Sequence, residues 1–272
     1  MALVVNTNTF SLNAQKNLAV HGEKLAGSFA KLSSGLRIVS AADDAAGLGI
    51  SERMRAEIRS LGMAQRNSQD GVSLVQTAEG ALAEVSGNLI RMRELAVEAA
   101  NGTLNTADRA SLDSEFQALD DEINRVAGQT EFNGISLLNS AATISIQVGT
   151  TTGQTIDIVT ADMQSATLGV AALNVTTAGL ASTALAGLDT AIDSVVAQRG
   201  DFGASQNRLS SAMRSIATAK ENLSGAESRI RDVDVASETA ELTKNRILQQ
   251  AATSVLGQAN TQPQLAMSLL QG

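Results

Sequence analysis

The chain has 272 residues, a net charge of −8 at neutral pH, no cysteine, and an aromatic content of only 2%. The missing cysteines exclude disulfides, thiolate catalysis and Cys-based metal sites. An acidic chain with scattered Lys and Arg is also a poor binder of nucleic acid. Any core must be built from Leu, Ile, Val and Ala, and the many helix formers with a single Pro favour long helices packed along narrow seams.

The usual signals for membrane insertion and secretion are missing from the sequence. No run approaches the roughly 18 apolar residues of a membrane-spanning helix. The opening segment, MALVVNTNTF, has neither the basic region nor the long apolar region of a secretory signal. Composition alone therefore predicts a cytoplasmic chain with no membrane insertion.

Apolar residues recur at spacings of three and four over most of the chain, which is the pattern of helices in coiled coils. It predicts helices from about Thr9 to Leu36, from Met54 to Asn101, and from Thr106 to Gly128. A longer helix is predicted on one seam from Leu185 to Ile230, and another begins near Leu242. Because the loop between the second and third helices is short, these two should run antiparallel.

The periodicity changes to two in the middle of the chain. Ile144, Ile146 and Val148 alternate with polar residues, a Thr-rich turn follows, and Ile156 and Ile158 resume the alternation, so we expect a β-hairpin. The segment 160–182 is rich in small residues without periodicity, and we expect irregular surface structure there.

A joint is predicted between the first two helices, in the stretch LSSGLRIVSAADDAAGLGISERM. Gly35 would end the first helix. Ser40 and Asp43 have the spacing of a capping box that could start the next one, and Asp43 and Asp44 would place negative charge at its N-terminus. Gly47 completes the set of candidate joint residues.

The predicted layout is nested, because the chain ends pair and enclose the middle. We expect residues 1–44 with 232–272 to form an inner domain of terminal helices, and residues 45–231 to form a rod-like helical domain with a short variable region at about 140–182. The fold class is mainly α, with a long coiled-coil hairpin made by both termini and a small β-hairpin region.

No catalytic or metal-binding group emerges from the residue pattern. His21 is the only histidine and has no Cys or carboxylate partner at helical spacing, so a solvated or interface role fits it best. Asp232 and Asp234 suit a helix cap better than a metal pair, and Gly47-x-Gly49 lacks the third glycine of a phosphate-binding loop. We expect no enzyme activity, no metal and no cofactor.

The terminal helices carry more apolar surface than one partner can cover, as the wide face of Leu248, Ala251, Ala252, Val255 and Leu256 shows. Large exposed apolar patches mark interaction sites, and the missing partners are expected to be other copies of the chain. We expect the termini to order only on assembly. The predicted inter-subunit packing residues are Leu18, Leu25, Phe29, Leu32, Leu248, Val255, Leu256, Leu269 and Leu270.

Five segments carry a resemblance to the bacterial flagellins over nearly the whole chain. They are the joint itself, NSQDGVSLVQTAEG, RMRELAVEAANG, GQTEFNG and ILQQAATSVLGQAN. The resemblance implies a structural subunit of the extracellular flagellar filament, secreted unfolded through a type III export channel, which replaces the cytoplasmic expectation. It also implies as partners other copies in a helical homopolymer, an export chaperone, the filament cap and hook-junction proteins.

The resemblance adds one more class of partner, innate immune receptors of the Toll-like class. The positions that match their contact site are Arg91, Leu95 and Glu115. A hook-associated or junction protein of the flagellum is the alternative function. A helical signalling coiled coil is disfavoured, because it would need a membrane span.

Overall fold

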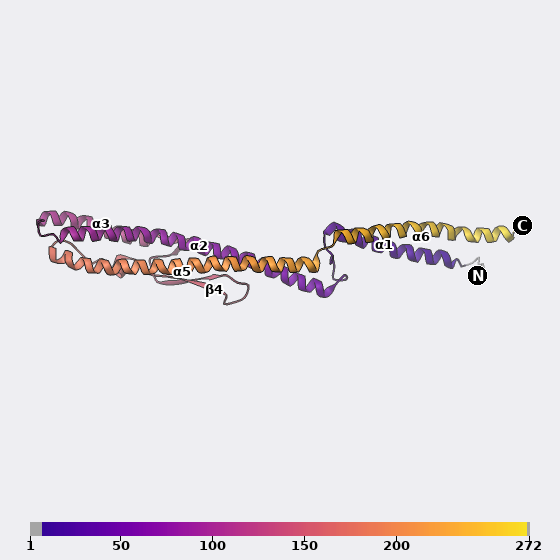
Figure 1. The fold of residues 1–272 in the computed structure, drawn as a ribbon, viewed down its shortest axis with the longest axis horizontal. Coiled ribbons are helices and arrows are strands. Elements are labelled where there is room, and N and C mark those ends of the chain that lie inside the picture. The colour runs from indigo at the N-terminus through magenta and orange to yellow at the C-terminus, as the bar shows by residue number, and fades with distance from the viewer. Residues whose placement is uncertain (1–6, 271–272) are drawn as a thin grey trace. The chain divides into compact units, whose positions relative to one another are not determined.

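The computed structural model describes the backbone of residues 7–270 and the side chains of residues 7–262. The chain divides into two compact units, one made of residues up to 56 together with those from 222 on, and the other of residues 57–221. Long helices dominate both units (Figure 1), so the mainly helical fold with a small β region is confirmed.

The first unit is built on a pair of helices from the two chain ends, α1 (Thr9–Ser34) and α6 (Val235–Leu270), which lie side by side in Figure 1. They run antiparallel. At one end the Val233 amide donates to the Gly35 carbonyl, and at the other the Asn8 side chain donates to the Ala259 carbonyl at 2.7 Å. The predicted pairing of the chain ends is confirmed.

Three helices build most of the second unit: α2 (Ala45–Ala99), α3 (Thr106–Gln129) and α5 (Ala178–Arg231). The short loop after α2 turns α3 back along it, as predicted, and Arg109 ties the turn by donating to the Ala99 carbonyl at 2.8 Å. Asn105 and Asp108 form a complete capping box at the start of α3.

The core of the second unit is a continuous stripe of aliphatic side chains with a few larger ones. Fully buried members are Leu82, Leu89, Met92, Leu95, Phe116, Ile123, Leu188 and Phe202. Their spacing along α2 and α5 is that of a coiled-coil seam, so the apolar periodicity of the sequence predicted the core directly.

Two antiparallel hairpins lie in the second unit. β3 (Ala142–Gln147) pairs with β4 (Thr155–Thr160), with Ile144 opposite Ile158, which confirms the predicted hairpin. A second hairpin, β1 (Glu131–Phe132) with β2 (Ile135–Ser136), is formed by segments not predicted as strands. Its turn residues Asn133 and Gly134 both have positive φ, 52° and 77°, as a tight Asn-Gly hairpin turn requires.

The segment 160–182 is irregular over most of its length, as its composition predicted, but it is not confined to the surface. It includes the short helix α4 (Ser165–Leu168) and the start of α5. Met163, Val170 and Val175 are buried members of the core. The segment thus contributes single buried side chains to the core without the spacing of a helix or strand repeat.

One described helix, α5, is long and apolar enough by composition to cross a membrane. Its Leu188, Val195 and Phe202 follow one another at seven-residue spacing and are buried in the core of the second unit. A core helix of a soluble protein passes the same test of length and composition, and 28% of the most apolar stretch of α5 is buried.

The division between the two units differs from the predicted boundaries at residues 44 and 231. The first turns of α2 and the last turns of α5 belong with the terminal helices. Arg231 pairs with Glu52, and Arg55 with Glu227, so these ends of the two long helices are tied to each other within the first unit.

Asp120 is a buried charge whose removal should stabilise the second unit. Its side chain is only 8% exposed, its Oδ1 atom has no hydrogen-bond partner, and burial raises the pKa of its carboxyl group. An acid with a raised folded-state pKa favours folding at low pH, and that contribution is lost as the pH rises through the folded pKa. Asp120→Asn should therefore raise the free energy of unfolding at pH 7 by about 1 kcal/mol, measured by urea denaturation. The gain should shrink toward pH 3, and a gain independent of pH would contradict the assignment.

Candidate assembly surfaces and the joint

The fully buried positions of the α1–α6 pair hold small and polar side chains. The buried residues along α1 are Ser11, Ala14 and Ser28, and those along α6 are Asn245 and Ala259. Half-way along, His21 and Gly22 are half-buried, and a Cβ on Gly22 would lie 3.9 Å from the Gln249 amide nitrogen. Polar groups and small side chains let two helices approach closely but remove little apolar surface from water.

Eight large apolar side chains of the two helices point the other way. Phe10, Leu12, Val20 and Phe29 of α1 are exposed, and so are Val235, Ile247, Leu248 and Val255 of α6. Phe29 is 56% exposed and Ile247 and Val255 are each 59% exposed. The pair thus fully buries only small and polar residues, keeps the leucines of its seam half-buried, and leaves eight large apolar side chains exposed, which is less burial than a helix pair stable on its own would have.

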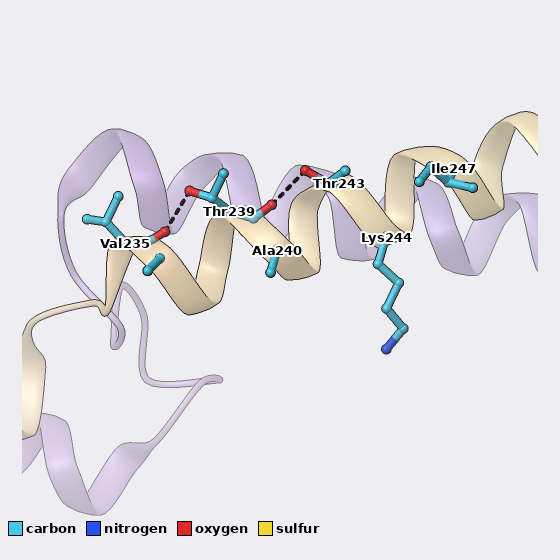
Figure 2. Close-up of a pocket in the computed structure, with 7 residues that line it drawn as sticks. Val235, Thr239, Ala240, Thr243, Lys244 and Ile247 are labelled. Atoms are coloured by element: carbon cyan, nitrogen blue, oxygen red, sulfur yellow. Dashed lines mark hydrogen bonds between the residues drawn. The ribbon is translucent and has the colours of Figure 1, made fainter.

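The outer face of α6 carries an open, shallow groove along its first three turns, lined by residues of this helix alone (Figure 2). Thr239 and Thr243 donate their hydroxyls to the carbonyls of Val235 and Thr239 at 2.6 and 2.8 Å. These bonds turn the hydroxyls toward the backbone, which leaves methyl groups on the surface beside Ala240 and Ile247. The groove is therefore more apolar than its sequence suggests.

The structure separates the predicted inter-subunit packing residues into two groups. Leu18, Leu25, Leu32 and Leu256 are half-buried along the seam between α1 and α6, where they already have partners within the chain. Phe29, Leu248 and Val255 are exposed and free for an outside partner. Leu269 and Leu270 lie outside the residues whose side chains are described. The outward residues Ile247 and Phe10 were not singled out from the sequence, although their apolar character signals them.

The joint is held by a short two-strand contact between the two chain crossings. Leu36 bridges Asp232, with the Arg37 amide donating to the Arg231 carbonyl at 2.6 Å and the Val233 amide to Gly35 at 3.0 Å. Gly35 makes the exit from α1 with a φ of +71°, a left-handed conformation that favours glycine. The predicted joint is thus an ordered structure in which the outgoing and returning chains bind each other.

Helix α2 is capped four residues later than the predicted capping box, whose first residue was Ser40. The Asp44 side chain accepts from the Gly47 amide at 2.8 Å, so Asp44 is the cap and the helix starts at Ala45. Ser40 and Asp43 close the loop before it. The Asp43 carboxylate accepts from the Ser40 amide and hydroxyl at 2.8 and 3.0 Å, and these bonds lower the pKa of Asp43. Their predicted role as the capping box of α2 is wrong, because the loop needs both groups for its own turn.

The predicted receptor-contact residues do not share one surface. Arg91 and Glu115 are exposed and bound to each other at 2.8 Å across α2 and α3. Leu95 is 0% exposed and packs in the core, so its side chain is unavailable to any partner of the folded unit.

The described residues offer no cluster of metal ligands. They contain no group of three or more His, Asp and Glu side chains placed to hold a metal ion. Asp234 accepts from the amides of Ala236 and Ser237 at the start of α6, which is a capping role. The chain instead carries exposed apolar surfaces on α1 and α6. A pair of chain-end helices with apolar outer faces is a feature of self-assembling structural proteins.

Comparison with known proteins agrees with that class. Residues 5–143 match the bacterial flagellin N-terminal helical region, and residues 185–270 match the bacterial flagellin C-terminal helical region. A flagellin of Halalkalibacterium halodurans is 46% identical over 272 residues, covering 99% of this chain and 100% of that protein. A flagellin of Bacillus subtilis is 42% identical, covering 98% and 99%. The chain belongs to the bacterial flagellin family.

Solved structures agree with this assignment. The crystal structure of Bacillus cereus flagellin is 40% identical and matches with a TM-score of 0.52, covering 56% of this chain and 88% of that chain. A putative flagellar hook-associated protein from Vibrio parahaemolyticus matches with a TM-score of 0.59 over 70% of this chain and 100% of that one. At 16% identity, the second likeness concerns the fold alone.

Gly47 should be the residue of the joint that is least tolerant of a side chain. A Cβ there would lie 2.8 Å from the Ile38 side chain and even closer to the Asp44 carboxylate. Gly47→Ala should therefore ease local opening of the first turn of α2 by about 1–3 kcal/mol, measured by amide hydrogen exchange. Gly49→Ala is the matched control, because its Cβ meets nothing within 4 Å, and it should slow exchange slightly. Equal exchange in the two variants would contradict the close fit at Gly47.

Proposed function

We propose that this chain is a structural subunit that polymerises into the extracellular bacterial flagellar filament used for swimming. Head-to-tail contacts between identical copies repeat without closing, and such contacts build helical filaments. One relative, from Treponema maltophilum, is named a flagellar filament 30.7 kDa core protein and is 40% identical over 98% of this chain and 100% of its own length.

The observation that carries the proposal is the apolar surface that the α1–α6 pair leaves exposed. Fully burying one Val, Leu, Ile or Phe side chain contributes about 1.5–3 kcal/mol, and the pair leaves eight such side chains exposed among its described residues. Other copies of the same pair can cover these faces with equally apolar ones. In this proposal the terminal helices form the inner part of the filament, and they become ordered only there.

Further features of the proposal rest on family membership. The chain is secreted unfolded through a type III channel, and it meets an export chaperone, the filament cap and hook-junction proteins on its way into the filament. The hook-associated alternative has less support, because its solved counterpart shares only the fold. Recognition by Toll-like receptors stays a prediction that rests on Arg91 and Glu115, since Leu95 is buried.

Seeded growth of the purified chain tests the proposal. Short filament fragments are mixed with monomer, and elongation is followed by light scattering and electron microscopy. Ile247→Ser with Val255→Ser should raise the critical concentration at least about tenfold, because each copy loses the burial of two side chains and 1.4 kcal/mol corresponds to a factor of ten.

The matched control is Gln250→Ser with Gln258→Ser, two exposed polar positions on the same helix, which should leave the critical concentration within about twofold. Absence of filaments from the unsubstituted chain would refute the proposed function. Equal growth of both double variants would refute the role of the outer face of α6.

A further inference from the structure

The charges of this chain are divided unevenly along its length. Residues 73–203 contain sixteen Asp and Glu against five Arg and no Lys, whereas the rest of the chain contains fifteen Lys and Arg against twelve Asp and Glu. The stretches 57–72 and 204–221 belong to the same unit and contain five Lys and Arg against three Asp and Glu. The second unit therefore has an acidic part and a basic part.

One row of exposed residues on α2 passes from the basic part to the acidic part. Its members are Arg59, Arg66, Glu84, Arg91 and Glu98, all exposed. Steps of seven and eighteen residues return to nearly the same side of a helix with 3.6 residues per turn. The row thus begins with two arginines and ends among glutamates.

At the acidic end the row is widened by α3. Glu115 lies beside the row because it binds Arg91 at 2.8 Å, and Glu122, seven residues further along α3, lies on the same side of that helix. Arg91 also binds Glu94, and Arg125 binds Glu122. The arginines here are therefore already engaged within the chain, while Glu84 and Glu98 have no ion-pair partner among the described residues.

At the basic end the arginines lack carboxylate partners. Within the described part of the chain neither Arg59 nor Arg66 makes an ion pair. The Arg66 guanidinium donates a hydrogen bond to the sulfur of Met63. A long stretch of α2 separates these side chains from the free acids, so the two groups cannot meet within one copy. They can meet between two copies.

We propose that Arg59 and Arg66 of one copy bind the acidic row of a second copy, formed by Glu84 and Glu98 with Glu115 and Glu122. This contact rests on the proposed function, because it needs copies that run in the same direction. The two charge groups are centred about 28 residues apart on α2, so the second copy is displaced by about 40 Å at 1.5 Å per residue. Without displacement, like charges would face each other, and with it the contact is heterologous and repeats from copy to copy.

Exposed charges of this kind set register and association rate more than affinity, and salt screens them. Elongation should therefore slow as ionic strength rises, with the displacement between copies unchanged. The apolar faces of α1 and α6 would still hold the polymer together.

Two charge-reversed variants test the contact in seeded growth. The acidic variant carries Arg59→Glu with Arg66→Glu, and the basic variant carries Glu84→Arg with Glu98→Arg. When either variant is used without the other, like charges meet at every contact between copies. The rate of elongation should then fall about tenfold. In an equimolar mixture unlike charges meet again wherever the two alternate, and elongation should return to within about twofold to threefold of the unsubstituted rate. Recovery in the mixture also excludes misfolding as the cause of the loss.

The control is Gln65→Glu with Gln76→Glu, which adds negative charge at exposed positions of α2 about 90° away from the row and should leave elongation nearly unchanged. The contact is overturned if the unsubstituted chain elongates seeds and the acidic variant grows as fast as this control. It is equally overturned if the mixture grows no faster than either variant alone, or yields only closed dimers. If the unsubstituted chain fails to elongate seeds, the proposed function falls, and this contact falls with it.

Discussion

The structure depends on one constraint, which is that the α1–α6 pair fully buries only small and polar side chains and leaves its leucines half-buried. This burial is too small to hold two long helices alone. Ordering a residue costs on the order of 1–2 kcal/mol of backbone entropy, and a seam of Ser11, Ala14, Ser28 and Asn245 recovers little of it by burial. Small side chains have a compensating use, because they let the helices approach closely and turn Phe29 and Ile247 outward. The pair is therefore arranged to be completed by partners.

The second unit differs from the α1–α6 pair because it buries its large apolar side chains within a single chain. Its seam of Leu82, Leu89, Phe116 and Phe202 is fully buried within one chain, so this unit can fold before any partner arrives. Because α2 and α5 contribute residues to both units, the chain passes from one unit to the other within these two helices, beyond the joint where the two crossings bind each other. Gly47 has the closest packing in that region, which explains why a glycine stands in a helix start that would otherwise favour a side chain.

The periodic parts of this fold could be predicted from the sequence, and the parts set by single contacts could not. Spacings of three and four gave the helices and core, and alternation gave the β3–β4 hairpin, because these patterns follow from backbone geometry. The turn between β1 and β2 has the Asn-Gly pair typical of a tight hairpin, although the strands beside it are too short to show an alternating pattern. The burial of Met163 and Val175, and the choice of Asp44 over Ser40 and Asp43 as cap, depend on neighbours distant in sequence or on competing turns. The outward direction of Phe29 was equally hidden, since a heptad seam does not show which of two apolar stripes faces inward.

The two kinds of surface on this chain supply different things to a polymer. Apolar faces such as that of Ile247 and Val255 yield free energy on burial, but they are non-directional, and two such stripes can slide by a turn with little loss. A charge row that changes sign once along α2 has one favourable displacement, so it can select register while contributing little binding energy. Strong but unspecific contacts from the chain ends and weak but specific ones from the second unit would together give a filament that is stable and regular.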